Sequence, residues 1–386
     1  VSTLGGVHAM SDEQSRRIRL GIIGCGGIMT HHVKGLVDRG ESVEFTWLCD
    51  VDAAQLEKMA GHVRGFGSGK TRQTARYEDV LADPDIDAVH INMPIPDHAP
   101  QSLAGLNAGK HVACTVPMAT SIDECEALVA AQRKSGTKYI MMETVVYSRE
   151  FLFVKSLYDS GELGRLQFLR GSHLQEMAGW PGYWEGLPPM HYATHCVSPC
   201  LCLPGRLADT VVCRGSGRIS KELTSKYGSP FAVETATFSM HDSDLCAEVT
   251  RSLFETARQY IESFDVYAEK VSYEWPRIEH EKAILHRGET PELVTVPDFA
   301  DRLPEGIRRF TTKGVYDADE AQHLSFTQGS GHGGSHPHLA HEFLSAIVDD
   351  RDPLPDAPTS ANWTMTGICA HMSAMKGGQP VQIPRF

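Results

Sequence analysis

A short glycine-rich loop near the start of the chain constrains its fold more than any other feature. Residues 19–23 are mainly apolar, Gly24, Gly26 and Gly27 follow them, and residues 31–38 have a helical pattern. Glycine at the first position permits a tight turn, and the next glycine lets the backbone approach a ligand closely. A buried strand, a glycine turn and a helix in this order predict the first unit of a parallel, doubly wound sheet.

Strand-like and helix-like segments alternate through the first part of the chain. Short apolar runs predict strands at residues 19–23, 45–49, 87–92, 111–115 and 139–143. Helical patterns occur at residues 31–38, 53–63, 99–107 and 121–135. In the last of these, Ser121 is the expected N-cap, and Glu124 completes a capping box. The alternation predicts an α/β Rossmann domain over residues 11–146.

The second part of the chain, residues 147–386, has a different pattern. Apolar and polar residues alternate with period two at residues 166–174, 211–217, 232–240, 245–254 and 258–268. Helices are predicted at residues 150–160, 337–349 and 360–376. These patterns predict an α+β domain with an open, mostly antiparallel sheet. The C-terminal helices are free to pack back on the first domain.

Composition excludes several classes of partner. Among the 386 residues, 49 acidic side chains outnumber 36 basic ones, so the net charge is −13. Such a surface disfavours nucleic acid and anionic membranes, and no apolar run is long enough to span a bilayer. Residues 1–10 have neither the charged start nor the apolar centre of a signal peptide. We therefore expect a cytoplasmic protein whose native start is Met10.

The ten cysteines are scattered, which fits a reducing compartment. Cys196, Cys200 and Cys202 lie close together, and a metal site there is an alternative that we considered. Cys200 and Cys202 lie in an apolar segment, however, and small buried cysteines are common. His191 and His195 are also spaced to share a helix face, but no further ligand motif accompanies them. We predict no metal site.

The glycine loop is followed by an acid at the position where a dinucleotide site needs one. Asp50 ends the second predicted strand, where a carboxylate can bind the adenosine ribose. Its negative charge would repel a 2′-phosphate, which favours NAD over NADP. Met29 stands where the third glycine or alanine of the motif is usual, so the motif is incomplete. The alternative is a glycine turn in an α/β protein without a cofactor.

Four blocks of sequence resemble the Gfo/Idh/MocA family of sugar and polyol oxidoreductases. They run from Gly21 to Ile28, from Cys49 to Asp52, from Asn92 to His98, and from Ala108 through Val112 to Ala119. The resemblance implies a Rossmann domain followed by an open sheet that binds substrate and forms a homodimer or homotetramer. Pro94 and His98 would lie at the nicotinamide end. The implied NAD contacts are Gly24, Gly26, Gly27, Ile28, Asp50, Asn92, Pro94, His98, Thr115 and Pro117.

The chain departs from that family at the residues that usually carry its chemistry. The family has Glu-Lys-Pro where this chain has Thr115, Val116 and Pro117, so the usual lysine is absent. His191 stands where the family tends to have an aspartate, four residues before the retained His195. A simple dehydrogenase using the common lysine–aspartate pair is therefore not expected.

A branch of the family that holds NAD tightly and hydrolyses glycosides lacks that lysine as well. The NAD-dependent α-N-acetylgalactosaminidases have Glu-Val-Pro at this place, then Met-Met and a nearby tyrosine, Tyr-x-Thr-His and Gly-His-Gly-Gly. The corresponding runs here begin at Thr115, Met141, Tyr192 and Gly331. Thr115 replaces the glutamate of that motif. The NAD-dependent sulfoquinovosidases are a second group that this chain resembles, which would imply an anionic sugar.

The resemblance implies a redox route to glycoside cleavage, because no pair of flanking carboxylates is evident in the sequence. NAD would oxidise C3 of a hexoside, a base would remove the C2 proton, the aglycone would leave, and water and hydride would add back. His195 is the predicted base at the 3-hydroxyl, since the histidine pKa lies near neutrality. Tyr147, with a lowered pKa, is the predicted C2 base, and an aromatic wall is its alternative. His191 would shuttle protons or contact substrate.

Several further residues are predicted to contact the substrate. The aromatic faces of Trp180, Tyr183 and Trp184 suit sugar C–H surfaces, although surface or interface aromatics would have the same composition. His332 lies in a glycine-rich run that permits close approach, and Arg149 could meet an anionic substituent. Two other functions stay open at this point: a plain NAD-dependent sugar or polyol dehydrogenase, and a non-catalytic NAD-binding sensor.

Overall fold

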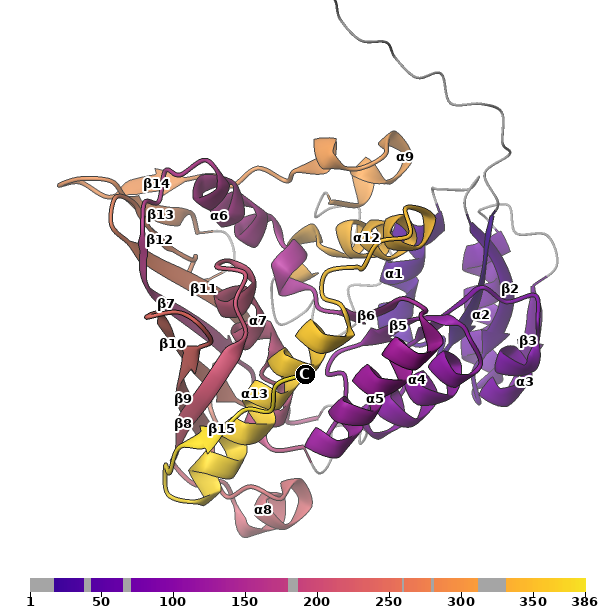
Figure 1. The fold of residues 1–386 in the computed structure, drawn as a ribbon, viewed down its shortest axis with the longest axis horizontal. Coiled ribbons are helices and arrows are strands. Elements are labelled where there is room, and N and C mark those ends of the chain that lie inside the picture. Colours follow the sequence, from indigo (N-terminus) through magenta and orange to yellow (C-terminus); the bar gives the residue numbers. More distant parts are fainter. Residues whose placement is uncertain are drawn as a thin grey trace, which may run out of the picture.

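The computed structural model describes residues 17–37, 43–64, 71–179, 187–258, 260–278, 281–311 and 331–386. They form a six-stranded sheet and a nine-stranded sheet, which lie on opposite sides of the molecule in Figure 1. No helix in this part of the chain is long and apolar enough to cross a membrane.

The first sheet has the strand order β3-β2-β1-β4-β5-β6, and all of its neighbouring strands are parallel. Most of its side chains are buried, because helices cover both faces of such a sheet. The predicted Rossmann fold is confirmed, although the short strand β3 was not predicted. The strands are β1 (Ile18–Ile23), β2 (Val43–Cys49), β3 (Arg72–Thr74), β4 (Ala88–Ile91), β5 (His111–Thr115) and β6 (Tyr139–Met142).

Five α-helices connect these strands. The capping box of α5 is present, since the Ser121 hydroxyl accepts from the Glu124 N–H and the Glu124 side chain accepts from the N-cap backbone. The first helix begins at Gly27, four residues before the predicted start, so the glycine loop leads directly into it. The helices are α1 (Gly27–Val37), α2 (Ala53–Arg64), α3 (Tyr77–Ala82), α4 (His98–Asn107) and α5 (Ile122–Ser135).

The second sheet has the strand order β14-β13-β12-β11-β7-β10-β9-β8-β15. Its pairs are antiparallel except β7 with β10, which confirms the predicted open, mostly antiparallel sheet. Strands β12 to β15 are short and were not predicted. The strands are β7 (Leu166–Leu174), β8 (Ala208–Ser216), β9 (Val233–Met240), β10 (Cys246–Ser252), β11 (Ile261–Ala268), β12 (Ser272–Glu274), β13 (Ala283–His286), β14 (Glu292–Val294) and β15 (Val381–Gln382).

Two C-terminal helices, α12 and α13, link the second part of the chain to the first. Leu339, Phe343 and Leu344 of α12 join the apolar cluster beneath α1, so this C-terminal helix packs on the first sheet's layer. Helix α13 runs between the two sheets in Figure 1. The helices are α6 (Arg149–Asp159), α7 (Thr194–Cys202), α8 (Lys221–Tyr227), α9 (Glu305–Arg308), α12 (His336–Val348) and α13 (Ala357–Met375).

Helix α7 was not predicted from the sequence, and it positions the centre of the site. It is short, contains Pro199, and lies almost fully buried on the second sheet. A Cβ at Gly171 of β7 would lie 2.1 Å from the carbonyl oxygen of Cys196, so only glycine allows this close contact. Periodicity did not reveal the helix because all of its sides are buried.

Candidate active site

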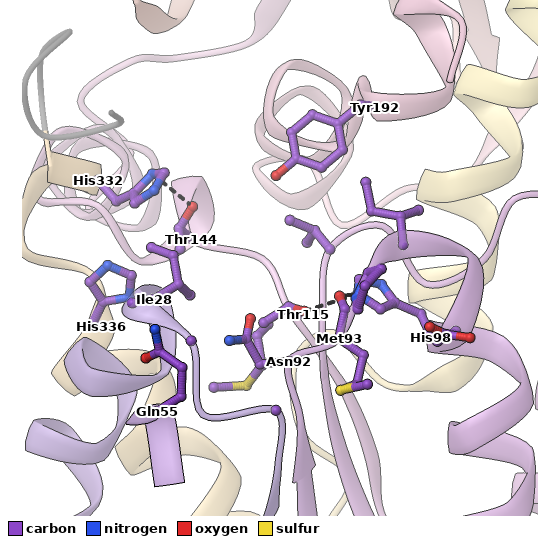
Figure 2. A pocket seen from close by; sticks show the side chains of 18 of the residues that line it. Ile28, Gln55, Asn92, Met93, His98, Thr115, Thr144, Tyr192, His332 and His336 are labelled. Atoms are coloured by element: carbon purple, nitrogen blue, oxygen red, sulfur yellow. Dashed lines mark hydrogen bonds between the residues drawn. The ribbon is translucent and has the colours of Figure 1, made fainter. Parts of the chain in front are cut away.

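A cavity of about 720 Å³ lies between the two sheets. One end is lined by the loops that follow β1, β2 and β4, and the other by residues of α7 and α12 and of the segments that precede β11 and α12. Ligands of open parallel sheets bind outside the carboxyl ends of the strands, where this cavity lies. Figure 2 shows its lining, with Asn92 and Thr115 near the centre, His332 and His336 on one side and His98 on the other.

The glycine loop forms the first end of the cavity. Gly24 has a φ of 87°, and a Cβ there would lie 2.0 Å from the carbonyl oxygen of Asn92. Asp50 accepts a 2.7 Å hydrogen bond from the Cys25 N–H and so holds the loop against the end of β2. Helix α1 begins at Gly27, and its first turn contains no acidic side chain. Backbone N–H groups at a helix N-terminus are suited to a pyrophosphate, and this donor set fits a dinucleotide.

Nine of the ten residues predicted to contact the cofactor line this cavity. They are Gly24, Gly26, Gly27, Ile28, Asp50, Asn92, Pro94, His98 and Thr115. Pro117 is the exception and is not among the lining residues. It follows a cis peptide bond, and its carbonyl oxygen accepts from Nδ1 of His98 at 2.8 Å. Its effect on the cavity is exerted through that histidine.

His98 is held on both of its ring nitrogens. Nδ1 lies 2.8 Å from the carbonyl oxygen of Pro117, and Nε2 lies 2.8 Å from that of Met93. Burial opposes a positive charge on the ring, whereas Cys114 and the two carbonyls favour it, and the pKa of His98 rises to about 9. The geometry thus favours an imidazolium that donates two hydrogen bonds. Thr115, 3.2 Å from Nε2, faces the same ring.

His195 lies in the first turn of α7 and lines the other end of the cavity. Its Nδ1 lies 2.7 Å from Oε1 of Glu143, and its Nε2 lies 3.7 Å from Oε1 of Glu262. Burial disfavours the imidazolium, but the two carboxylates outweigh burial and raise the pKa of His195. A buried histidine that can accept a proton at Nε2, with its Nδ1–H held by a carboxylate, is suited to act as a general base.

The two carboxylates beside His195 were not identified from the sequence. Glu143 immediately follows β6, and its position at the carboxyl end of a parallel strand was a usable signal. Glu262 lies in β11, within an alternating pattern that points to a strand but not to a site. Gln175, Tyr192 and Tyr260 also line the cavity and were missed. Figure 2 shows the Tyr192 hydroxyl pointing into it.

The prediction for Tyr147 was wrong in its geometry. Its hydroxyl donates a 2.6 Å hydrogen bond to the carbonyl oxygen of Leu354, and Tyr147 is not among the residues that line the cavity. Burial, followed by the negative charge of Glu342, raises its pKa well above the ordinary value. A tyrosine with a raised pKa and a hydroxyl engaged elsewhere is not placed to remove a proton from a substrate in this cavity.

His191 and Arg149 also lie outside the cavity lining. The His191 ring packs edge-on against His371, and burial lowers its pKa to about 3, so it stays neutral. The Arg149 guanidinium donates to the carbonyl oxygens of Thr311 at 2.6 Å and Gly333 at 3.4 Å. It braces the glycine run that carries His332. The predicted contacts of both residues with substrate are not found in this geometry.

His332 lines the cavity, as expected for a substrate contact. Its Nδ1 lies 3.2 Å from Oε1 of Glu262 and 3.5 Å from the Thr144 hydroxyl, as Figure 2 shows for the latter. Trp180, Tyr183 and Trp184 lie outside the described residues.

Within the described ranges, no group of three or more histidine, cysteine or acidic side chains could hold a metal ion. Of the cysteines considered as ligands, Cys196 and Cys200 are buried free thiols, and Cys202 is a partly buried one. Cys196 donates to the carbonyl oxygen of Ala193, and Cys200 donates to that of Cys196. Burial is the main cause that raises the pKa of the Cys196 thiol to about 12, so it stays protonated.

Residues 18–143 match the model of the Gfo/Idh/MocA family, described as an oxidoreductase family with an NAD-binding Rossmann fold. The chain carries a Gfo/Idh/MocA NAD-binding domain. The prediction of NAD as the cofactor is thereby confirmed. The loop, Asp50 and the N-terminus of α1 line the cavity and stay the predicted contacts of the cofactor. The alternative of a glycine turn without a cofactor is removed.

Two groups of curated proteins are similar to the chain in sequence. A glycosyl hydrolase family 109 protein of Shewanella baltica is 30% identical over 198 residues, which cover 47% of this chain and 43% of that protein. An inositol 2-dehydrogenase of Salmonella paratyphi B is 29% identical over 161 residues, covering 40% of this chain and 46% of that protein. The matches thus span less than half the length of these relatives.

Solved structures share the whole fold at low sequence identity. An NAD-binding oxidoreductase from Klebsiella pneumoniae has a TM-score of 0.76 at 16% identity, covering 96% of this chain and all of that one. Levoglucosan dehydrogenase, solved with NADH and levoglucosan, has a TM-score of 0.73 at 18% identity, with coverage of 96% and 100%. At these identities the likeness establishes the fold of both parts of the chain.

Proposed function

We propose that the chain is an NAD-dependent enzyme that oxidises a ring carbon of a sugar or glycoside, as the first step of glycoside cleavage. The observation that carries the proposal is His195, held by Glu143 at 2.7 Å, in the same cavity as the glycine loop of the NAD-binding domain. A base that shares a cavity with a hydride acceptor is the minimum arrangement for oxidation of an alcohol.

Bound NAD supplies an acceptor for the hydride of the carbinol carbon and can return that hydride later. The chain's own residues handle the protons. His195 takes the hydroxyl proton at Nε2, while Glu143 stabilises the imidazolium through Nδ1–H. Once C3 is a ketone, the C2 proton is acidic, and its removal expels the aglycone from C1. Water then adds at C1 before the ketone is reduced, so that the net reaction is hydrolysis.

Removal of the C2 proton needs a second base within the cavity. The Tyr147 hydroxyl is engaged by Leu354, so this role passes to other residues. Among the described lining residues, Tyr192 and His332 carry groups that can accept or relay a proton. Tyr192 is the tyrosine whose hydroxyl points into the cavity in Figure 2.

The charge of the lining favours an uncharged sugar over an anionic one. Three aspartates are among the described lining residues, namely Asp50, Asp52 and Asp97. The described lining includes no lysine or arginine. The guanidinium of Arg149 is engaged by two carbonyl oxygens instead. A sulfonate or phosphate on the substrate would therefore meet these three carboxylates and no lysine or arginine in the described part of the cavity, while the imidazolium of His98 is held by two carbonyl oxygens.

The similarity to glycosyl hydrolase family 109 supports the cleavage step, and the absence of the usual family lysine at Val116 supports it further. The similarity to inositol 2-dehydrogenase supports a second candidate, a dehydrogenase of a cyclic polyol or sugar. In that case His195 would act as the base in the same way, but the hydride would leave as NADH.

Incubation of the purified protein with NAD and a panel of neutral aryl glycosides in deuterated water tests the proposal. We expect release of the aglycone, deuterium at C2 of the sugar product, and no net NADH. Aglycone release without deuterium at C2 would exclude the elimination route. Stoichiometric NADH from free sugars or inositols without cleavage would establish the dehydrogenase, and inertness in both assays would favour a non-catalytic sensor.

A further inference from the structure

His195 is contacted by two carboxylates that come from the two different sheets. Glu143 follows β6 of the first sheet, and Glu262 lies in β11 of the second. Both are buried, with side-chain exposures of 0% and 4%, and they lie on opposite nitrogens of the ring. One carboxylate suffices to orient an imidazole, so the second one calls for a separate explanation.

The surroundings of His195 oppose a positive charge on its ring. Arg251 of β10 is fully buried nearby and donates to the backbone carbonyls of Tyr192, His173 and Ser252 and to the Gln175 side chain. Its cation, together with burial, disfavours protonation of His195. The rings of His173 from β7, Tyr192, and His332 also pack around His195, and His173 stays neutral because burial lowers its pKa. When His195 takes up a proton, the two carboxylates therefore act against both burial and the charge of Arg251.

Glu262 also holds the segment that brings His332 to the cavity. Its Oε1 lies 3.2 Å from Nδ1 of His332 and accepts a hydrogen bond from the Tyr260 hydroxyl. His332 has a φ of 56°, in the left-handed region that side chains other than glycine adopt rarely. Such a conformation persists only where surrounding contacts over-determine it. The Glu262 contact is one that would be lost if the segment moved away.

We propose that Glu262 is a positioning residue that ties His195 and His332 into one buried cluster and makes His195 able to accept a proton inside the cavity. Glu143 fixes the tautomer of His195, and Glu262 supplies the second negative charge and the anchor for His332. This inference rests on the proposed function, since it assigns His195 the part of the base. It also implies that the base is complete only when both sheets contribute their carboxylate.

The test uses the full chain with NAD bound and compares Glu262→Gln, Glu262→Asp and a matched control, Glu234→Gln. Glu234 is a fully buried glutamate with Oε1 2.7 Å from Nδ1 of His371, but it does not line the cavity. Imidazole nitrogen NMR would follow the protonation of His195, assigned with a His195→Gln variant. The pH profile of kcat/KM on the glycosides found active would be recorded alongside, together with NAD affinity and melting temperature.

We expect Glu262→Gln to lower the pKa of His195 by at least about one unit, to move the acidic limb of kcat/KM by the same amount, and to reduce kcat about tenfold to a hundredfold. Glu262→Asp should restore most of the titration, and Glu234→Gln should change neither readout. An unchanged His195 titration in a folded, NAD-binding Glu262→Gln protein would overturn the proposal. If Glu262→Gln shifts the titration of His195 but the wild-type protein is inactive on every substrate, the role of Glu262 stands and the proposed function is excluded.

Discussion

The two ends of the cavity are built in different ways. The glycine-loop end consists of residues that directly follow parallel strands, such as Gly24, Asp50 and Asn92, so its geometry is local to short stretches of chain. The His195 end brings together Glu143, His195 and Glu262, which lie on elements of both sheets. The first end is determined by the topology of one sheet. The second depends on how the two parts of the chain pack. Substitutions at each end can test this difference.

The largest expected effect is on catalysis at the His195 end. His195→Ala should reduce kcat about a hundredfold to ten-thousandfold, because a positioned general base contributes about that much. NAD affinity, measured by fluorescence titration, should change less than about twofold, since the predicted cofactor contacts lie mainly at the glycine-loop end. Full activity in this variant would remove His195 as the base, and a parallel loss of NAD binding would show that the two ends are not independent.

Gly24→Ala should act at the glycine-loop end, where it should reduce NAD affinity rather than the function of the general base. The residue has a φ of 87°, and a new Cβ would lie 2.0 Å from the carbonyl oxygen of Asn92. We expect the free energy of unfolding to fall by about 3 kcal/mol and NAD affinity to fall more than about tenfold. Gly136→Ala is the matched control: its φ is 69°, but nothing lies within 4 Å of the new Cβ. Equal losses in urea titrations of both variants would mean that backbone strain alone, and not the contact with Asn92, accounts for the effect.

The first sheet and the His195 end of the cavity should respond to acid with opposite signs. Beneath α1, Nδ1 of His32 lies 3.0 Å from Nε2 of His90, and burial lowers the pKa of His90 to about 3. The folded state keeps this ring neutral while the unfolded chain takes up the proton below about pH 6.5, so stability is lost as pH falls. At pH 5 the loss is about 2 kcal/mol for each such histidine. The raised pKa of His195 works the other way: its contribution is present at low pH and lost as pH rises.

Urea titrations of the wild type and His90→Phe at pH 7 and pH 5 isolate this contribution. The variant should lose less stability on acidification, by about 2 kcal/mol, because the phenyl ring has no proton to gain. A difference near zero between the two proteins would show that His90 is already protonated in the fold at pH 5.

The same contrast explains how much of the molecule could be predicted. Strand–helix alternation and the glycine loop predicted the first sheet, and nine of the ten residues predicted to contact the cofactor line the cavity. Period two likewise predicted the long strands of the second sheet. Glu262 was missed because alternation shows which face a residue occupies but not what lies opposite it. Tyr147 was misplaced because its partner, Leu354, is more than two hundred residues away in sequence.

Asp50→Asn probes cofactor choice with a smaller expected effect. The amide oxygen can still accept from the Cys25 N–H, which bonds Oδ2 at 2.7 Å, so the glycine loop keeps its anchor, whereas the 2.8 Å bond from the Asp52 N–H to Oδ1 is lost. Removal of the negative charge should raise the affinity for NADP relative to NAD by about tenfold, or roughly 1.4 kcal/mol. Competition of the two cofactors in a binding assay measures the ratio. An unchanged ratio would move the discrimination to another residue, for example Asp52, which also lines the cavity.

Tyr147→Phe should have the smallest effect on activity, because Tyr147 is not among the residues that line the cavity. The hydroxyl bonds the carbonyl oxygen of Leu354, so its loss should lower the free energy of unfolding by about 1 kcal/mol and change kcat less than about threefold. Tyr192→Phe is the comparison, because the Tyr192 hydroxyl points into the cavity in Figure 2. If Tyr147→Phe instead reduced kcat a hundredfold, its hydroxyl would have to reach the substrate during turnover. The segment before α13 that carries Leu354 would then release it as the cavity fills.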